Sequence, residues 1–130
     1  MIVIDASVAL NACLSDVAFA PLEPQQLVAP NLLWSEVLSV LHEMRWRREV
    51  SSELANHACE RLREAPIAPR RPARLSTEAW RVADEFGWTK TYDAEYVALA
   101  NLLGCRLVTL DARLRRTASR LVDVVGPTEL

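Results

Sequence analysis

The chain has 130 residues, of which 51% are hydrophobic and 25% are charged, and its net charge is −2. This balance is typical of a single globular domain over residues 1–130 and excludes a disordered chain. No apolar run approaches the ~20 residues that span a bilayer, so we expect no membrane association. The opening stretch MIVIDASVAL has no basic segment and contains Asp5, so no signal peptide is predicted and we expect a cytoplasmic protein.

Short apolar runs alternate with segments that have helical character. Strands are predicted at residues 1–5, 27–30, 105–111 and 121–126, and residues 66–75 (PIAPRRPARL) as short extended structure or loop. Helices are predicted at residues 6–14, from Asn31 to about 46, at 51–65 after Ser51 or Ser52, from Ser76 or Thr77 to Gly87, and at 93–103 before Gly104. This alternation favours an α/β fold around a mainly parallel sheet.

Three acids from distant segments are predicted to meet at one edge of that sheet. Asp5 ends the first strand and Asp111 ends the 105–111 strand, so both lie at the carboxyl ends of strands, where open α/β sheets bind ligands. Asp93 begins a helix that leads back into the Asp111 strand, and such a crossover helix starts at the same edge. The sequence therefore brings Asp5, Asp93 and Asp111 together.

Glu36 is a fourth acid near this edge, about two turns into the helix that follows the second strand. Helical side chains lean toward the N-terminus of their helix, so its carboxylate can reach the edge. The apolar face of this helix is predicted to comprise Leu33, Trp34, Val37, Leu38, Val40, Leu41 and Met44. Glu36 lies at the border of that face, so periodicity alone does not single it out.

Each acid also has an ordinary structural explanation. Asp5, Asp93 and Asp111 stand where an aspartate commonly caps a helix, and Glu36 suits a helix surface. Together, however, four carboxylates at one edge repel one another unless a cation offsets their charge. Mg²⁺ and Mn²⁺ are hard ions that prefer oxygen ligands, so the set favours one of them.

The other residue types that bind metals do not suggest a rival site. Cys13, Cys59 and Cys105 are odd in number and widely spaced, which argues against disulfides and zinc and predicts inert packing. His42 and His57 fall on predicted helices and are interpreted as ordinary helix residues.

Four blocks of the sequence carry a resemblance to a known family. VIDASVAL, SEVLSVL, TYDAEYVALA and RLVTLDARL resemble the four acidic blocks of PIN-domain nucleases, and among these the VapC-type toxins of prokaryotic toxin–antitoxin pairs. The match runs from Ile4 to Leu114 in the family order. D-A-S alone would be a weak signal, whereas Y-D-A-x-Y-V-A-L-A followed by L-V-T-x-D is specific.

The resemblance implies a three-layer α/β/α sandwich with a central parallel sheet and an acidic quartet of Asp5, Glu36, Asp93 and Asp111. Asp5, Asp93 and Asp111 are the expected direct metal ligands. Glu36 is expected to bind the metal through water or to help deprotonate the nucleophile, and these two roles stay open. Ser7 matches a small hydroxyl residue that supports the first acid. Glu95 has no counterpart in the pattern, and we interpret it as an accessory or structural acid.

The resemblance also implies an Mg²⁺- or Mn²⁺-dependent endoribonuclease that acts as a toxin, forms a homodimer and is silenced by a small VapB-like antitoxin. Arg113, Arg115 and Arg116 directly follow Asp111 and are candidates for contacting RNA, although they could equally meet an acidic partner or solvent. Trp34 and Trp46 suit either core packing or the binding of an antitoxin or second subunit.

Two other functions are weighed against this one. A phosphotransferase resembling haloacid dehalogenases needs a second Asp two residues after the first, and Ser7 occupies that place. A non-catalytic PIN-like module that binds nucleic acid or protein is the remaining alternative, and the presence of all four acids disfavours it.

Overall fold

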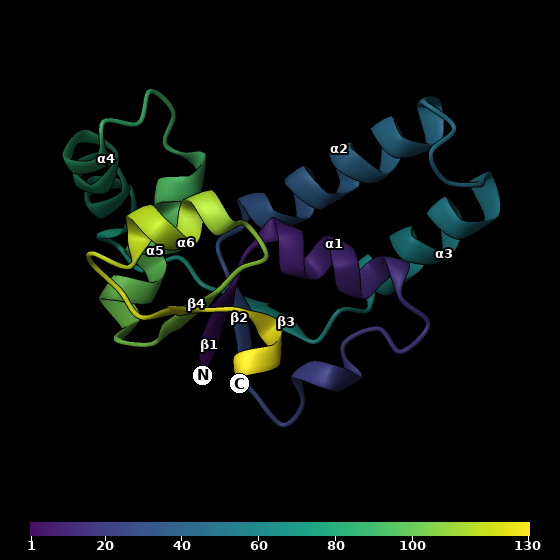
Figure 1. Ribbon diagram of the computed structural model, residues 1–130, viewed down its shortest axis with the longest axis horizontal. Coiled ribbons are helices and arrows are strands. Elements are labelled where there is room, and N and C mark those ends of the chain that lie inside the picture. Colours follow the sequence, from purple (N-terminus) through teal and green to yellow (C-terminus); the bar gives the residue numbers. More distant parts are fainter.

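Five short strands form one parallel sheet at the centre of the computed structural model, which describes residues 1–130 (Figure 1). The strands are β1 (Ile2–Ile4), β2 (Leu27–Ala29), β3 (Ile67–Pro69), β4 (Arg106–Val108) and β5 (Val124–Val125). Their order is β3-β2-β1-β4-β5, and all four neighbouring pairs are parallel. The parallel sheet predicted from the sequence is confirmed.

Six α-helices cover this sheet. They are α1 (Ala6–Leu14), α2 (Leu32–Trp46), α3 (Ser52–Arg63), α4 (Leu75–Phe86), α5 (Tyr92–Leu103) and α6 (Ala112–Ala118), with short 3₁₀ turns at Ala20–Leu22 and Pro127–Glu129. Helices α1, α2 and α3 pack together on one side, and α4, α5 and α6 lie on the other (Figure 1). The three-layer α/β/α sandwich is therefore confirmed. No helix combines the length and apolar character needed to cross a membrane.

The core is built from the middle strands and the helix that crosses them. Val3, Ile4 and Val28 are fully buried, because parallel strands are covered by helices on both faces. Helix α5 packs on β1 and β4 and is buried from Tyr96 to Ala100. Its apolar sequence is that of a central helix, and its N-terminal turn is held against the carboxyl edge of the sheet.

The ends of several helices follow the predicted signals. Asp5 and Ser51 accept hydrogen bonds from backbone N–H groups of α1 and α3, while Gly87 and Gly104 end α4 and α5 in the left-handed conformation. Asn31 stands at the N-cap of α2, as its place before the predicted helix suggests, but its backbone is already helical and its side chain makes no capping bond. The predicted start of α4 at Ser76 or Thr77 is late, since that helix begins at Leu75.

Two elements near the C-terminus differ from their predictions. Strand β4 ends at Val108 rather than at Asp111, and the sequence reading missed α6, which begins directly after Asp111. The last strand, predicted at residues 121–126, contains only Val124–Val125. The turn of chain between β4 and α6 is therefore longer than expected, and it contains Thr109.

A buried polar contact fixes α4 against α5. The Glu78 carboxylate is only 8% exposed and accepts a 3.1 Å hydrogen bond from the Asn101 side chain, together with bonds from Arg81. These bonds hold the pKa of Glu78 below its ordinary value, Arg81 being the main cause. The contact secures the helix that presents Asp93 to the sheet edge.

Candidate active site

The register between β1 and β4 sets the first part of the site. Ile4 pairs with Val108, and the Asp5 N–H donates a 3.2 Å hydrogen bond to the Val108 carbonyl oxygen. The residues that follow the two strands are therefore neighbours, and the Thr109 hydroxyl donates a hydrogen bond to Oδ2 of Asp5. Parallel pairing brings a hydroxyl to the first acid from more than a hundred residues away.

The other oxygen of Asp5 is held by residues close in sequence. The Ser7 hydroxyl donates a 2.6 Å hydrogen bond to Oδ1 of Asp5, and the Val8 N–H donates one of 3.2 Å to the same atom. Ser7 Oγ in turn accepts a 3.0 Å bond from the Leu110 N–H. A carboxylate has about four acceptor positions, so three bonds leave one on Oδ2. Asp5 is thus buried, fixed in place and able to accept one more ligand.

Asp111 is the N-cap of α6. Its Oδ1 accepts hydrogen bonds of 2.9 Å from the Arg113 N–H and 3.3 Å from the Leu114 N–H, while its own N–H donates a 3.0 Å bond to Thr109 Oγ1. The Thr109 hydroxyl therefore joins Asp5 to Asp111. The side chain of Asp111 is exposed, with Oδ2 outside these capping bonds.

Asp93 lies in the first turn of α5 rather than at its cap, which is Thr91. The pKa of Asp93 is raised, first by loss of solvation and then by the negative charge of Asp111, while Arg113 opposes the rise. Asp93 and Asp111 line one depression of the surface together with Arg113. The interpretation of Asp93 as a helix cap is therefore wrong, whereas its predicted proximity to the carboxyl edge is confirmed.

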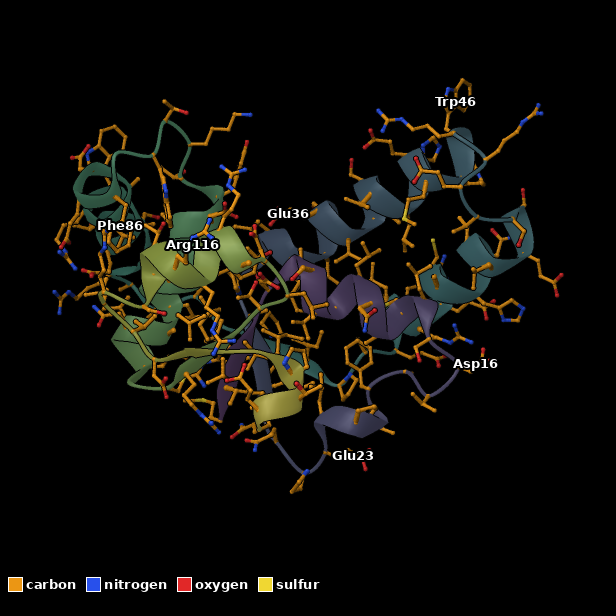
Figure 2. All side chains as sticks on the ribbon, viewed as in Figure 1. Asp16, Glu23, Glu36, Trp46, Phe86 and Arg116 are labelled. Carbon is orange, nitrogen blue, oxygen red and sulfur yellow. The ribbon has the colours of Figure 1, made fainter.

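Glu36 is connected to the site by a hydrogen bond from Tyr96, which lies three residues after Asp93 on α5. The buried Tyr96 hydroxyl donates a 2.6 Å hydrogen bond to Oε1 of Glu36. Glu36 is the fifth residue of α2, so it is closer to the helix start than the predicted two turns. Figure 2 labels Glu36 where α2 begins, close to the start of α1.

The electrostatics link all four acids. Burial is the largest cause of the raised pKa of Asp5 and of Glu36, and hydrogen bonds from Ser7, Thr109 and Tyr96 oppose it. The charge of Asp93 raises both pKa values further, and Asp5 acts on Glu36 as well. Asp5, Glu36, Asp93 and Asp111 thus form one region of coupled negative charge.

The quartet is not closed into a finished ligand set. No three side chains among the His, Cys, Asp and Glu residues are placed closely enough to hold a metal ion together. Three of the acids, Asp5, Glu36 and Asp111, are instead oriented by hydrogen bonds from their own neighbours. The structure brings the four predicted residues to one edge, and their roles as ligands stay predictions.

Other predicted residues fall in different places. Glu95 lines a separate groove with Arg71 and Trp80, and Arg71 opposes the rise in its pKa that burial causes. Arg113 lies beside Asp93, but the Arg115 guanidinium is paired with Glu129, Nη2 lying 2.8 Å from Oε2. The three arginines predicted to contact RNA therefore do not form one group.

The remaining predictions concern packing. The three cysteines are free thiols, as expected, and burial raises the pKa of Cys13 to about 11. His42 and His57 are exposed helix residues. Trp34 packs against the core, whereas Trp46 is 78% exposed at the far end of α2 (Figure 2).

Sequence reasoning missed Thr109, Tyr96 and Trp88. Thr109 stands in the L-V-T-x-D block between two recognised positions, and Tyr96 follows Asp93 by three residues, a spacing that places both on one side of a helix. Trp88 lines both depressions that adjoin Asp93. Spacing could have indicated Tyr96, whereas only the sheet register identifies Thr109.

Comparison with known families agrees with this geometry. The model of the PIN domain matches residues 2–120, which is most of the chain. The chain therefore belongs to the PIN-domain family. Its fold also matches the crystal structure of PAE2754 from Pyrobaculum aerophilum with a TM-score of 0.72 and 25% identity, covering 98% of this chain and 91% of that one. FitAB bound to a DNA fragment shares the fold at a TM-score of 0.67 and 15% identity, covering 100% of this chain and 97% of that one.

Similar sequences define the enzyme class within that family. Ribonuclease VapC9 of Mycobacterium tuberculosis and VapC ribonuclease Mb0985 of Mycobacterium bovis are each 35% identical over 118 residues, which is 90% of this chain and 91% of the relative. The relatives are VapC ribonucleases, so this chain is a hydrolase of the ribonuclease class and the toxin of a toxin–antitoxin pair.

Proposed function

We propose that the chain hydrolyses RNA phosphodiester bonds inside the strand with Mg²⁺ or Mn²⁺ held by Asp5, Asp93 and Asp111. The observation that supports this most is the meeting of four acids at one sheet edge: Thr109 joins Asp5 to Asp111, and Asp93 lines one depression with Asp111 and another with Glu36. Such a concentration of negative charge in a partly desolvated site is a feature of functional sites and favours a cation.

The chemistry of the candidate donors suits a hard divalent cation, although no three of these side chains lie close enough to hold one ion together. All the candidate ligands are carboxylate oxygens, and Asp5 keeps one acceptor position free after its three hydrogen bonds. Both Ser7 and Thr109 donate to Asp5, so they fix the orientation of its carboxylate and oppose the rise in its pKa that burial causes. A bound divalent ion supplies positive charge that lowers the pKa of water and offsets charge on phosphate oxygens.

The protein groups then divide the remaining work. Glu36 is the candidate for receiving the proton of the attacking water or for binding the ion through water, and its raised pKa suits a base. Tyr96 orients the Glu36 carboxylate through the hydrogen bond that its hydroxyl donates. Arg113, beside Asp93, is placed to contact an RNA phosphate, and Arg116 is a second candidate on the same helix.

A partner is part of the proposal. We infer that a small VapB-like antitoxin silences the enzyme, that the toxin forms a homodimer and that both act in the cytoplasm. An exposed apolar part of α2 supports a protein partner. The sequence places Leu38 on the apolar face of this helix and makes Trp46 suitable for the core or for a partner, and the two side chains are 51% and 78% exposed. Co-expression with a small protein encoded beside this chain should abolish cleavage, and a lack of any complex would contradict the partner while leaving the nuclease intact.

Cleavage of structured RNAs tests the mechanism directly. Wild-type protein should cut RNA with Mg²⁺ or Mn²⁺ and stop in EDTA. Mutating a residue that only hydrogen-bonds to a metal ligand typically lowers activity by roughly 10- to 100-fold. Asp93→Asn alters a proposed ligand itself, so its cleavage activity should fall by more than that. Glu95→Gln is the matched control, because Glu95 lies two residues away on the same helix but faces another groove, and its charge is only the last of the causes that raise the pKa of Glu36. Activity that survives EDTA, or a fully active Asp93→Asn, contradicts the mechanism, whereas RNA binding without any cleavage favours the non-catalytic binding module.

A further inference from the structure

Two depressions of the surface adjoin Asp93, and one aromatic residue lines both. The first depression is lined by Glu36, Trp88, Lys90, Tyr92 and Asp93, among others. The second is lined by Trp88, Asp93, Asp111, Arg113 and Thr117, together with Leu114. Trp88 and Asp93 are thus the two residues shared by both depressions, beside the acids that the proposed chemistry uses.

The backbone and a neighbouring ring hold Trp88 in this position. Gly87 ends α4 with φ at 70°, a left-handed conformation that glycine adopts at little cost, and this turns the chain toward the site. The backbone N–H of Trp88 then donates a 2.9 Å hydrogen bond to the Ala83 carbonyl oxygen. The Phe86 ring packs against the indole at 5.1 Å between centroids and a tilt of 58°. The indole is therefore only half-buried but well supported, since its other contacts are with the core.

Positive charge flanks the acids within the same depressions. Lys90, the single lysine of the chain, lies in the first depression, and Arg113 lies in the second. The exposed ring of Tyr92 lies beside Lys90. An aromatic platform between two cations suits a strand of RNA, in which bases alternate with phosphates along the chain.

We propose that Trp88 is a nucleobase-binding residue, which stacks an unpaired base of the RNA next to the scissile phosphate at the acidic edge of the sheet. Lys90 contacts the phosphate on one side of that base, and Arg113 contacts the phosphate on the other. Such a base belongs to an unpaired segment of the RNA. Bases inside a duplex are already stacked on their neighbours and do not present a free face. This inference rests on the proposed function, since it names the substrate of the same site.

Binding without cleavage separates this inference from the mechanism. A fluorescently labelled single-stranded oligoribonucleotide is titrated with protein in EDTA and followed by anisotropy, and the same strand in a duplex is titrated in parallel. Trp88→Leu keeps an apolar side chain without an aromatic face, and Trp88→Phe keeps the face. Trp80→Leu is the matched control, because Trp80 is 68% exposed and lines a separate groove.

Trp88→Leu should weaken single-strand binding by roughly tenfold to a hundredfold, which is the range for losing one stacked base. Trp88→Phe should recover most of that loss, duplex binding should change little, and Trp80→Leu should bind like the wild type. Equal losses for Trp88→Leu and Trp88→Phe, equal losses on single strand and duplex, or wild-type protein that binds no single strand would overturn the inference. Binding that depends on Trp88 in a protein that cuts no RNA would instead contradict only the proposed hydrolysis.

Discussion

The Tyr96 hydroxyl donates a 2.6 Å hydrogen bond to Oε1 of Glu36, joining α5 to α2 across the candidate active site. Tyr96 is 1% exposed, and burial together with Glu36 raises the pKa of its phenol, so the hydroxyl keeps its proton and remains a donor. The bond opposes the rise in the pKa of Glu36 that burial causes. Glu36 is thus kept closer to its ionised form by a residue outside the acidic quartet.

Tyr96→Phe should therefore raise the pKa of Glu36, because burial and the charges of Asp93 and Asp5 would remain without the opposing bond. If hydrolysis needs ionised Glu36, the acid limb of the profile of log(kcat/KM) against pH moves to higher pH. Activity on that limb should fall roughly tenfold, since a hydrogen bond to a charged group contributes about 1.5 to 3 kcal/mol.

The control for this change is a double-mutant cycle. In Glu36→Gln the carboxylate is absent, so adding Tyr96→Phe should cause no further shift of the profile. A shift of the same size in both backgrounds would mean that Tyr96 acts through packing and not through Glu36.

Thr109 offers a second test, because its hydroxyl donates to Asp5 and accepts from the Asp111 N–H. Thr109→Val keeps the shape of the side chain but leaves both groups without this partner. The affinity for Mn²⁺, measured from the metal dependence of cleavage, should fall about 10- to 100-fold. Thr109→Ser should restore it, and Thr128→Val, at an exposed threonine near the C-terminus, should leave it unchanged. Wild-type metal affinity in Thr109→Val would show that the hydroxyl only stabilises the turn.

Tyr96 and Thr109 show what sequence reasoning missed, and the acids beside them show what it found. Asp5, Asp93 and Asp111 could be predicted because strand ends and helix starts follow local patterns, and parallel strands place their carboxyl ends together. Glu36 joined them through the family resemblance. Ser7 was found because its place in the family pattern is beside Asp5. Thr109 depends on which residues of β1 and β4 face each other, and that register is fixed only by the assembled sheet.

The errors have physical causes of the same kind. Helix α6 has only seven residues, three of them arginines, so it shows little apolar periodicity, and Asp111 and its capping bonds define its start. Leu38 and Val40 suit the apolar face of α2 by spacing, but both are exposed, and the buried residues are Leu33, Val37 and Leu41. Spacing describes one helix and does not report how far its neighbours extend along it.

Asp93→Asn should stabilise the metal-free protein at neutral pH. An acid whose pKa is raised by folding holds its proton more readily when folded, so stability falls as pH rises through the interval between the two pKa values. The penalty from Asp93 is absent below its ordinary pKa of 3.8 and complete above the raised value. The variant should thus melt at a higher temperature than the wild type in EDTA at pH 8, and the difference should shrink as the pH falls toward 4.

Adding a divalent metal ion should reverse the order of the two melting temperatures, so that the wild type melts above Asp93→Asn. Mg²⁺ or Mn²⁺ stabilises whichever form binds it, so the wild type should gain more in Tm than Asp93→Asn. Glu23→Gln removes an exposed acid away from the site (Figure 2) and should alter neither result. A variant that melts below the wild type in EDTA at every pH would argue that Asp93 supports the fold instead of opposing it.

Arg113 and Arg115 should differ in RNA binding although they lie two residues apart on α6. Arg113 lines the depression that contains Asp93 and Asp111, whereas the Arg115 guanidinium is engaged by both carboxylate oxygens of Glu129. Arg113→Gln should weaken single-strand binding and reduce the slope of log K against log salt by about 0.7, the value for one phosphate contact on a single strand. Arg115→Gln should leave that slope unchanged and lower Tm instead, because it releases the turn at Pro127–Glu129. Equal salt slopes for Arg113→Gln and the wild type would remove Arg113 from the phosphate path, and a reduced slope for Arg115→Gln would mean that RNA displaces Glu129 from its arginine.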